Sequence, residues 1–260
     1  MDETLLNSME ACIRTAGERV RTAGKDLHID CKEGVGNYVT DCDVAVQDYL
    51  YENLTKLLPG AKFLGEERDM HPDVHKGLCF VVDPIDGTTN FIRGHGMSAI
   101  SVALAENGKP IAGIVYQPFR DEMYTAMLGK GAFCNGRAIH VTDRPFSSAI
   151  YQMGGSGHER GKNTDRAFRM MRTIFDHAED IRSYGVASVE LCNVACGRCD
   201  GYVEMILYPW DYAAGSLIVT EAGGRVSRID GSALTLDGTQ SVLCANSRTY
   251  DEALSLIKDF

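Results

Sequence analysis

The stretch VVDPIDGTTNF (residues 81–91) places two carboxylates, Asp83 and Asp86, three positions apart in a turn that follows an apolar run. Two like charges this close are costly to ionise together unless a positive charge lies near both. Gly87 gives the backbone the freedom for a tight turn, and Thr88 begins a segment that favours a helix start, where backbone N–H groups lack partners. Acidic oxygens beside free amides suit a hard cation and a phosphate group together. The stretch therefore predicts a combined cation and phosphate site.

Considered alone, Asp-Pro-Ile-Asp-Gly is also compatible with a plain turn, because Asp and Gly dominate turns. Four further acidic residues favour the site. Glu66 and Glu67 follow a short predicted strand, and Asp43 and Asp211 stand at two predicted helix starts. Either aspartate by itself is better explained by N-capping. Together with the turn, they match a Mg²⁺ site that combines a few carboxylates with substrate oxygens.

The elements that would position these residues begin with helices and continue with a sheet. Amphipathic spacing predicts helices over 2–23 and 43–58, the second opened by Asp43 as its N-cap. Short apolar or alternating runs then predict a largely antiparallel sheet, whose pairing should stop at Pro84, because proline cannot donate to a ladder. The predicted strands are 78–83, 99–106, 111–118 and 122–128, and a glycine-rich hairpin is expected over 129–139.

The second half of the chain alternates helices and strands. We predict an α/β layered sandwich in one compact unit, with a soft boundary between an N-terminal half (1–145) and a C-terminal half (146–260). The first half carries most of the candidate metal ligands, and the second carries Asp211 and the substrate pocket. The expected helices of the second half are 164–178, 187–198, 211–222 and 249–258, and the expected strands are 147–153, 181–184, 201–207, 224–229 and 241–247.

Composition limits the partners. The 260-residue chain has 26 Lys+Arg and 36 Asp+Glu, so its formal net charge is −10. This charge disfavours nucleic acid or an anionic membrane as a general partner. No apolar run is long enough to span a bilayer, and the acidic first residues indicate no signal peptide. The nine cysteines, an odd number scattered along the chain, favour reduced buried thiols in a cytoplasmic protein over a disulfide framework or a zinc site.

These segments resemble the inositol monophosphatase family, within the superfamily of Mg²⁺-dependent, lithium-sensitive phosphatases. The resemblance implies an αβαβα layered fold, the inositol monophosphatase/fructose bisphosphatase-like sugar phosphatase fold, and a homodimer. It covers nearly the whole chain, through VTDCD (39–43), GEE (65–67), DPIDGTTNF (83–91), GKGAFCNG (129–136), GYVEM (201–205) and WDYAAGSLIVTEAGG (210–224).

The resemblance also implies a role for each matching residue. A first Mg²⁺ would be bound by Glu66, Asp83 and the carbonyl of Ile85. A second would be bound by Asp83, Asp86 and Asp211, and a looser third would lie near Glu66 and Glu67. The catalytic set would comprise Glu66 and Thr88, the latter oriented by Asp43 to activate a metal-held water. The substrate contacts would be made by Asp86, by the amides of Gly87 and Thr88, which bind the phosphate, and by Glu204, which binds a substrate hydroxyl. Ala187 would lie in the pocket wall and Lys32 on a loop over the metals.

The implied activity is hydrolysis of inositol monophosphate, or of a similar small polyol phosphate, by in-line attack of a metal-activated water. Fructose 1,6-bisphosphate and 3′(2′),5′-bisphosphate nucleotides remain alternative substrates for the same chemistry. The nucleotide branch tends to carry Lys-Glu where this chain has Thr89-Asn90, which argues against it. Val186 and Ser188 depart from the family's usual small-residue run and would flank the substrate pocket, so they leave the exact substrate open.

A protein of another class also remains possible on this fold, namely a non-catalytic binding or regulatory protein. The complete set of acidic residues and Thr88 counts against a protein that has lost catalytic activity, because mutations accumulating without selection for catalysis would not preserve these particular residues.

Overall fold

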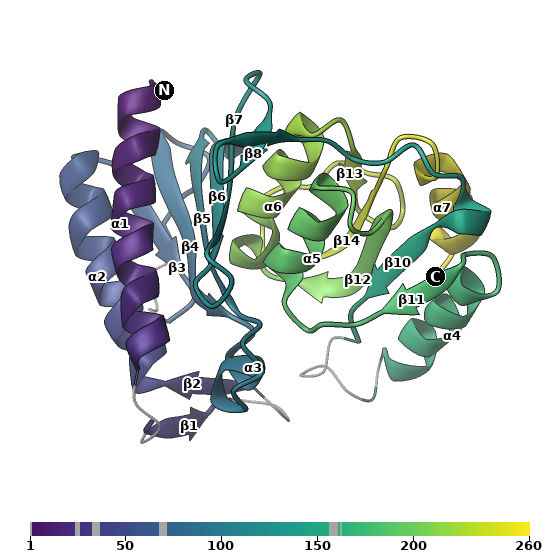
Figure 1. Ribbon diagram of the computed structural model, residues 1–260, viewed down its shortest axis with the longest axis horizontal. Coiled ribbons are helices and arrows are strands. Elements are labelled where there is room, and N and C mark those ends of the chain that lie inside the picture. The colour runs from purple at the N-terminus through teal and green to yellow at the C-terminus, as the bar shows by residue number, and fades with distance from the viewer. Residues whose placement is uncertain (1, 24–26, 33–36, 68–71, 156–160, 162) are drawn as a thin grey trace.

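The structure is a computed structural model that describes residues 2–23, 27–32, 37–67, 72–155, 161 and 163–260. Its first layer is a pair of long helices, α1 (Glu3–Thr22) and α2 (Asp41–Leu57), seen in purple and blue in Figure 1. Both helices are amphipathic, and their apolar faces pack on the larger sheet through side chains such as Ile13 and Leu50, which are fully buried. The helix predicted over 2–23 is thereby confirmed.

The larger sheet has seven strands in the order β3-β4-β5-β6-β7-β8-β9. Only its first pair, β3 with β4, is parallel, and every following pair is antiparallel, which confirms the largely antiparallel prediction. The strands are β3 (Lys62–Gly65), β4 (Leu78–Asp86), β5 (Ala99–Glu106), β6 (Lys109–Gln117), β7 (Glu122–Met127), β8 (Ala132–Cys134) and β9 (Arg137–Ile139).

The second sheet has five strands in the order β11-β10-β12-β14-β13. Strand β10 lies parallel to β11 and β12, whereas β14 is antiparallel to β12 and β13. The strands are β10 (Ile150–Met153), β11 (Asp180–Arg182), β12 (Gly201–Leu207), β13 (Arg225–Ser227) and β14 (Gln240–Ala245).

Helices α5 (Ala187–Ala195) and α6 (Pro209–Glu221) fill the space between the two sheets (Figure 1). Every residue of α5 is buried, as expected for a helix covered on both sides. Helices α4 (Thr164–Phe175) and α7 (Tyr250–Ile257) cover the outer face of the smaller sheet. The layers therefore follow the order α, β, α, β, α, which confirms the predicted fold class. The short elements are β1 (Ile29–Cys31), β2 (Tyr38–Thr40), α3 (Thr88–Ile92) and a 3₁₀ turn, Phe146–Ser148.

Two predicted helix starts were wrong by a few residues. Thr40, not Asp43, caps α2: its hydroxyl accepts from the Asp43 N–H, while the Asp43 carboxylate accepts from the Thr40 N–H at 2.8 Å. This reciprocal arrangement is a capping box. Helix α6 begins at Pro209, because proline suits the first helical turn, so Asp211 is its third residue and not its first. Helices α4 and α5 each end three residues earlier than predicted.

The prediction that pairing stops at Pro84 was also wrong. Strand β4 continues to Asp86, and the register with β5 shifts between Asp83, opposite Ser101, and Asp86, opposite Ala99. The chain passes Pro84 in a bulge and then rejoins the ladder, which is where sheets tolerate proline. Among the described residues, no helix is long and apolar enough to cross a membrane. All nine cysteines are free, as expected for reduced thiols, but the prediction that they are buried was wrong for three: Cys31 is exposed, and Cys134 and Cys196 are half-buried.

Candidate active site

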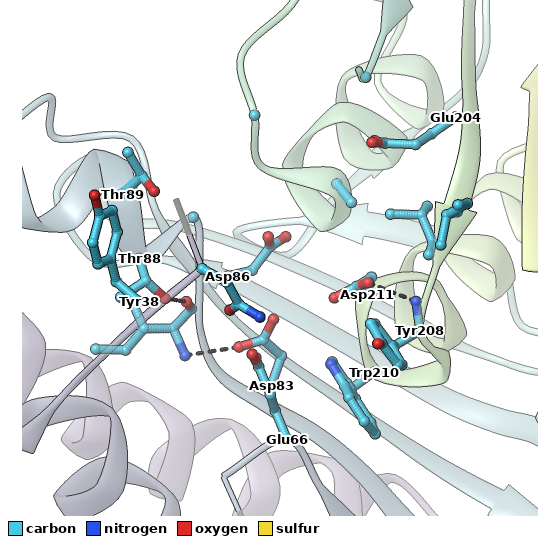
Figure 2. Close-up of a pocket in the computed structure, with 18 of the residues that line it drawn as sticks. Tyr38, Glu66, Asp83, Asp86, Thr88, Thr89, Glu204, Tyr208, Trp210 and Asp211 are labelled. Atoms are coloured by element: carbon cyan, nitrogen blue, oxygen red, sulfur yellow. Dashed lines mark hydrogen bonds between the residues drawn. The ribbon is translucent and has the colours of Figure 1, made fainter. Parts of the chain in front are cut away.

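One pocket gathers residues from both halves of the fold (Figure 2). It lies where the bulged end of β4 and the start of α3 meet the first turns of α5 and α6 and the end of β12. Figure 2 shows Asp83 and Asp86 on one side of this space and Asp211 on the other. The residues predicted from the sequence that line the pocket are Glu66, Asp83, Ile85, Asp86, Gly87, Thr88, Ala187, Glu204 and Asp211.

The bulge explains how two aspartates of one strand reach the same pocket. Successive side chains of a regular strand alternate between faces, so residues three apart would point to opposite sides. The extra residue in the bulge removes this alternation. Asp83 fixes the turn because its Oδ1 accepts the N–H of Ile85 at 2.9 Å. Gly87 follows with a φ of +83°, a left-handed conformation that favours glycine, and caps α3.

Thr88 connects the turn to α2. Its hydroxyl lies 3.2 Å from Asp43 Oδ1 and 3.0 Å from the carbonyl oxygen of Ile85, and both of these atoms accept. A hydroxyl has one proton, so it can donate fully to only one of them at a time. Asp43 is itself fully buried, and the capping box with Thr40 fixes its other oxygen. The hydroxyl of Thr88 is thus held beside a carboxylate, as predicted.

Lys32, Glu66 and Glu67 form a charged group at the edge of the pocket. The Lys32 ammonium lies 2.8 Å from Glu66 Oε1 and 2.7 Å from Glu67 Oε1. Burial lowers the pKa of Lys32, but the two carboxylates more than offset this, so its pKa lies above the ordinary value. Burial and the adjacent Glu66 raise the pKa of Glu67 to about 7. Lys32 therefore balances part of the negative charge that the two glutamates bring.

Among the described residues, no lysine or arginine forms an ion pair with the three aspartates of the pocket, Asp83, Asp86 and Asp211. Burial raises the pKa of Asp83 and of Asp211 well above the ordinary range, and their acidic neighbours raise both further. Burial likewise raises the pKa of Asp86, against the lowering effect of hydrogen bonds from Ser188. A bound cation would reverse this effect, since an opposite charge favours the ionised form. Oxygen-only donors of this kind suit Mg²⁺.

The carboxylates share the pocket without converging on one point. Within the described residues, no three His, Cys, Asp or Glu side chains are grouped closely enough to form a ready metal cluster. Asp211 has one oxygen, Oδ2, committed to the Tyr208 N–H at 2.7 Å, as part of the cap of α6. The fit to a cation thus rests on the chemistry and shared location of these oxygens.

The opposite wall of the pocket is formed around Glu204. Its Oε2 accepts from the hydroxyl of Tyr202 at 2.5 Å. Gly154 makes room for this carboxylate, because a Cβ at that position would lie 1.8 Å from Glu204 Oε2. Sequence reasoning missed Gly154, although the Gly-Gly pair directly after a predicted strand was an available signal. It also missed the aromatic pair at the rim, Tyr208 and Trp210, whose rings stack 4.9 Å apart.

The segment before α5 lies against the turn that follows β4. Asn90 donates to the carbonyl oxygen of Tyr184 at 2.8 Å, and Val186 approaches Gly87 closely. The sequence placed Val186 and Ser188 beside the pocket, but both are fully buried, and Ala187 between them lines it. Ser188 contacts Asp86 through its backbone and its hydroxyl. These two residues therefore act behind the pocket wall.

The layered fold, the bulged acidic turn and the facing glutamate define the class of metal-dependent sugar phosphatases. The chain matches the model of the inositol monophosphatase family over residues 1–259, and it belongs to this family. It is 36% identical over 271 residues to "Inositol monophosphatase 2" of Solanum lycopersicum, covering 100% of this chain and 99% of that protein.

Solved structures show the same fold. The suhB extragenic suppressor protein of Bartonella henselae has a TM-score of 0.90 at 30% identity, with 98% of this chain and 99% of that chain covered. SaIMPase-II, solved with inositol monophosphate bound, has a TM-score of 0.85 at 29% identity and covers 98% of this chain and 94% of its own. The family resemblance seen in the sequence is confirmed.

Proposed function

We propose that this protein is a Mg²⁺-dependent phosphomonoesterase that hydrolyses inositol monophosphate, or a similar small polyol phosphate, to the free polyol and phosphate. The observation that carries the proposal is one pocket in which the bulged, acidic end of β4, the start of α6 and Glu204 face each other. Membership of the inositol monophosphatase family supports the substrate class. The structure of SaIMPase-II with inositol monophosphate bound adds support from a relative.

The acidic residues would hold two to three Mg²⁺ ions. When bound, these ions would lower the pKa of the attacking water and stabilise the charge on the departing alkoxide. Glu66 would also belong to the catalytic set. The proposed ligands are Glu66, Asp83 and the Ile85 carbonyl for one ion, Asp83, Asp86 and Asp211 for a second, and Glu66 with Glu67 for a third.

The other residues would bind and orient. Thr88 is too weak a base to act alone, so Asp43, which accepts from its hydroxyl, would help it to orient the attacking water. The amides of Gly87 and Thr88 would hold the phosphate, since backbone N–H groups at a helix start favour an anion. Glu204 would accept a hydrogen bond from a hydroxyl of the polyol, and Ala187 would line the polyol-binding part of the pocket. Lys32 would cover the metal side of the pocket.

Several finer properties stay proposals. A homodimer and inhibition by lithium follow from the family resemblance, whereas a cytoplasmic location and two halves, 1–145 and 146–260, that act as one unit follow from the composition and the order of the predicted elements. Fructose 1,6-bisphosphate and 3′(2′),5′-bisphosphate nucleotides remain alternative substrates of the same pocket. A non-catalytic regulatory role remains the alternative of another class.

The test is phosphate release with and without Mg²⁺ from inositol 1-phosphate, glycerol 2-phosphate, fructose 1,6-bisphosphate and adenosine 3′,5′-bisphosphate. We expect Mg²⁺-dependent release with a preference for inositol 1-phosphate, and none from Asp86→Asn, which keeps an acceptor for Ser188 but loses the charge. Preference for another substrate would keep the chemistry and change the substrate. Silence on all four would sink the proposal and favour a binding role.

A further inference from the structure

Ser188 makes an unusual pair of contacts with one oxygen of Asp86. Its backbone N–H donates to Asp86 Oδ2 at 2.7 Å, and its hydroxyl donates to the same oxygen at 2.5 Å. Hydrogen bonds of a hydroxyl to a carboxylate are short and charge-assisted, about twice as strong as neutral ones. Ser188 is fully buried and Asp86 is only 8% exposed, so bulk water has little access to either bond. Competition from solvent therefore weakens these bonds little.

These contacts decide which oxygen of Asp86 faces the pocket. A carboxylate oxygen offers about two lone-pair sites, and the two donors of Ser188 occupy those of Oδ2. Oδ1 is then the oxygen left for another ligand. A side chain held in this way cannot rotate its carboxylate freely, so its available oxygen stays at a fixed place at the pocket wall.

Ser188 itself is held firmly. It is the second residue of α5, a helix whose every residue is buried. The segment before α5 is held by the helix itself, because the Glu190 carboxylate accepts a hydrogen bond from the N–H of Tyr184 at 2.8 Å. Val186 packs against Gly87, so the start of α5 lies directly on the turn that carries Asp86. Ser188 can thus transmit the position of α5 to Asp86.

We propose that Ser188 is a positioning residue for cation binding: its hydroxyl holds the Asp86 carboxylate so that only Oδ1 of Asp86 is available as a ligand. The proposal rests on the proposed function, because it needs Asp86 to bind Mg²⁺. Hydrogen-bond partners that orient metal ligands commonly contribute 10- to 100-fold to metal affinity. The backbone N–H remains when the hydroxyl is removed, so the expected effect lies at the lower end, about tenfold.

The experiment is Mg²⁺ binding by isothermal titration calorimetry to the metal-free protein, which does not depend on turnover. Ser188→Ala should weaken binding about tenfold. Ser98→Ala is the matched control: Ser98 is also buried, next to Ala99, which pairs with Asp86, and its hydroxyl has no partner among the described residues. The control should bind Mg²⁺ as the wild type does.

A second variant keeps the test valid if Ser188→Ala does not fold. Ser188→Cys fills the same space with a much weaker donor, so it should also bind Mg²⁺ more weakly than the wild type. Mg²⁺ binding that is unchanged or tighter in every variant that folds would overturn the positioning role. Tighter Mg²⁺ binding would show instead that the Ser188 hydroxyl withdraws negative charge from the Asp86 carboxylate. Absence of Mg²⁺ binding by the wild type would instead defeat the proposed function.

Discussion

The contact between Gly87 and Val186 gives a prediction that can be worked out in detail. Gly87 has a φ of +83°, and a Cβ added there would lie 2.6 Å from Cγ2 of Val186. Gly87→Ala therefore meets two separate costs, one in the backbone and one in packing. Gly94 offers a matched control, because its φ is +67° but a Cβ there would meet nothing within 4 Å. Gly94→Ala has the backbone cost alone.

The magnitudes follow from these geometries. A left-handed conformation costs a residue with a side chain about 1–2 kcal/mol. Forcing a methyl into a packed contact adds about 1–3 kcal/mol. Gly94→Ala should thus lower the free energy of unfolding by about 1–2 kcal/mol, and Gly87→Ala by about 2–5 kcal/mol. Val186→Ala removes the methyl groups that clash, so the double variant should regain the packing cost but not the backbone cost.

The assay is urea unfolding of the wild type, the three single variants and the double variant Gly87→Ala/Val186→Ala, in EDTA so that metal does not contribute. The double variant should be more stable than the sum of the single effects predicts, by about 1–3 kcal/mol. Additive effects, or equal losses for Gly87→Ala and Gly94→Ala, would refute the close packing of Val186 on the turn.

Three further predictions concern charged groups. Burial raises the pKa of Glu190 from 4.5 to about 8, so the folded state binds a proton more tightly than the unfolded state, and stability should fall as pH rises between these values. Glu190→Gln should flatten that decline in urea unfolding at pH 5 and pH 8, and an unchanged slope would contradict it. Asp200 is buried, and its carboxylate accepts a hydrogen bond from the N–H of Ile150 at 2.9 Å. Asp200→Ala should therefore lower the free energy of unfolding by about 3 kcal/mol or more. Asp251 is exposed, so the control Asp251→Ala should lower it by less than about 1 kcal/mol. Lys32→Gln removes a cation that competes for Glu66 and Glu67, so calorimetry should show tighter Mg²⁺ binding; weaker binding would mean that Lys32 assists the site.

The sequence predicted much of the fold because the spacing of apolar residues reflects both the local helix or strand period and the face of each element that is buried between layers. Amphipathic spacing located α1, and alternating apolar runs located β5 and β6. Helix boundaries were less accurate. Thr40 and Asp43 both suit an N-terminal cap, and only the structure shows that they share one in a reciprocal box. Pro84 was expected to end β4, but a bulge lets the strand rejoin its neighbour, which depends on the register with β5.

The candidate site was predicted as a set of residues, and the structure brings most of them to one pocket. Their roles stay predictions. What the sequence could not supply was the support behind the pocket wall. Ser188 was predicted to flank the pocket, but its contact with Asp86 was not predicted, because that contact joins residues 102 positions apart. Gly154 was missed for the same reason, since its role depends on how closely Glu204 approaches it across the sheet.

The most direct test of the central claim is a crystal soaked in Mn²⁺, which substitutes for Mg²⁺ and scatters anomalously, with Asp211→Asn as a second crystal. We predict anomalous peaks between Asp83, Asp86 and Asp211 in the wild type, and loss of the peak beside residue 211 in the variant. An active wild-type protein with no Mn²⁺ among these carboxylates would contradict the account.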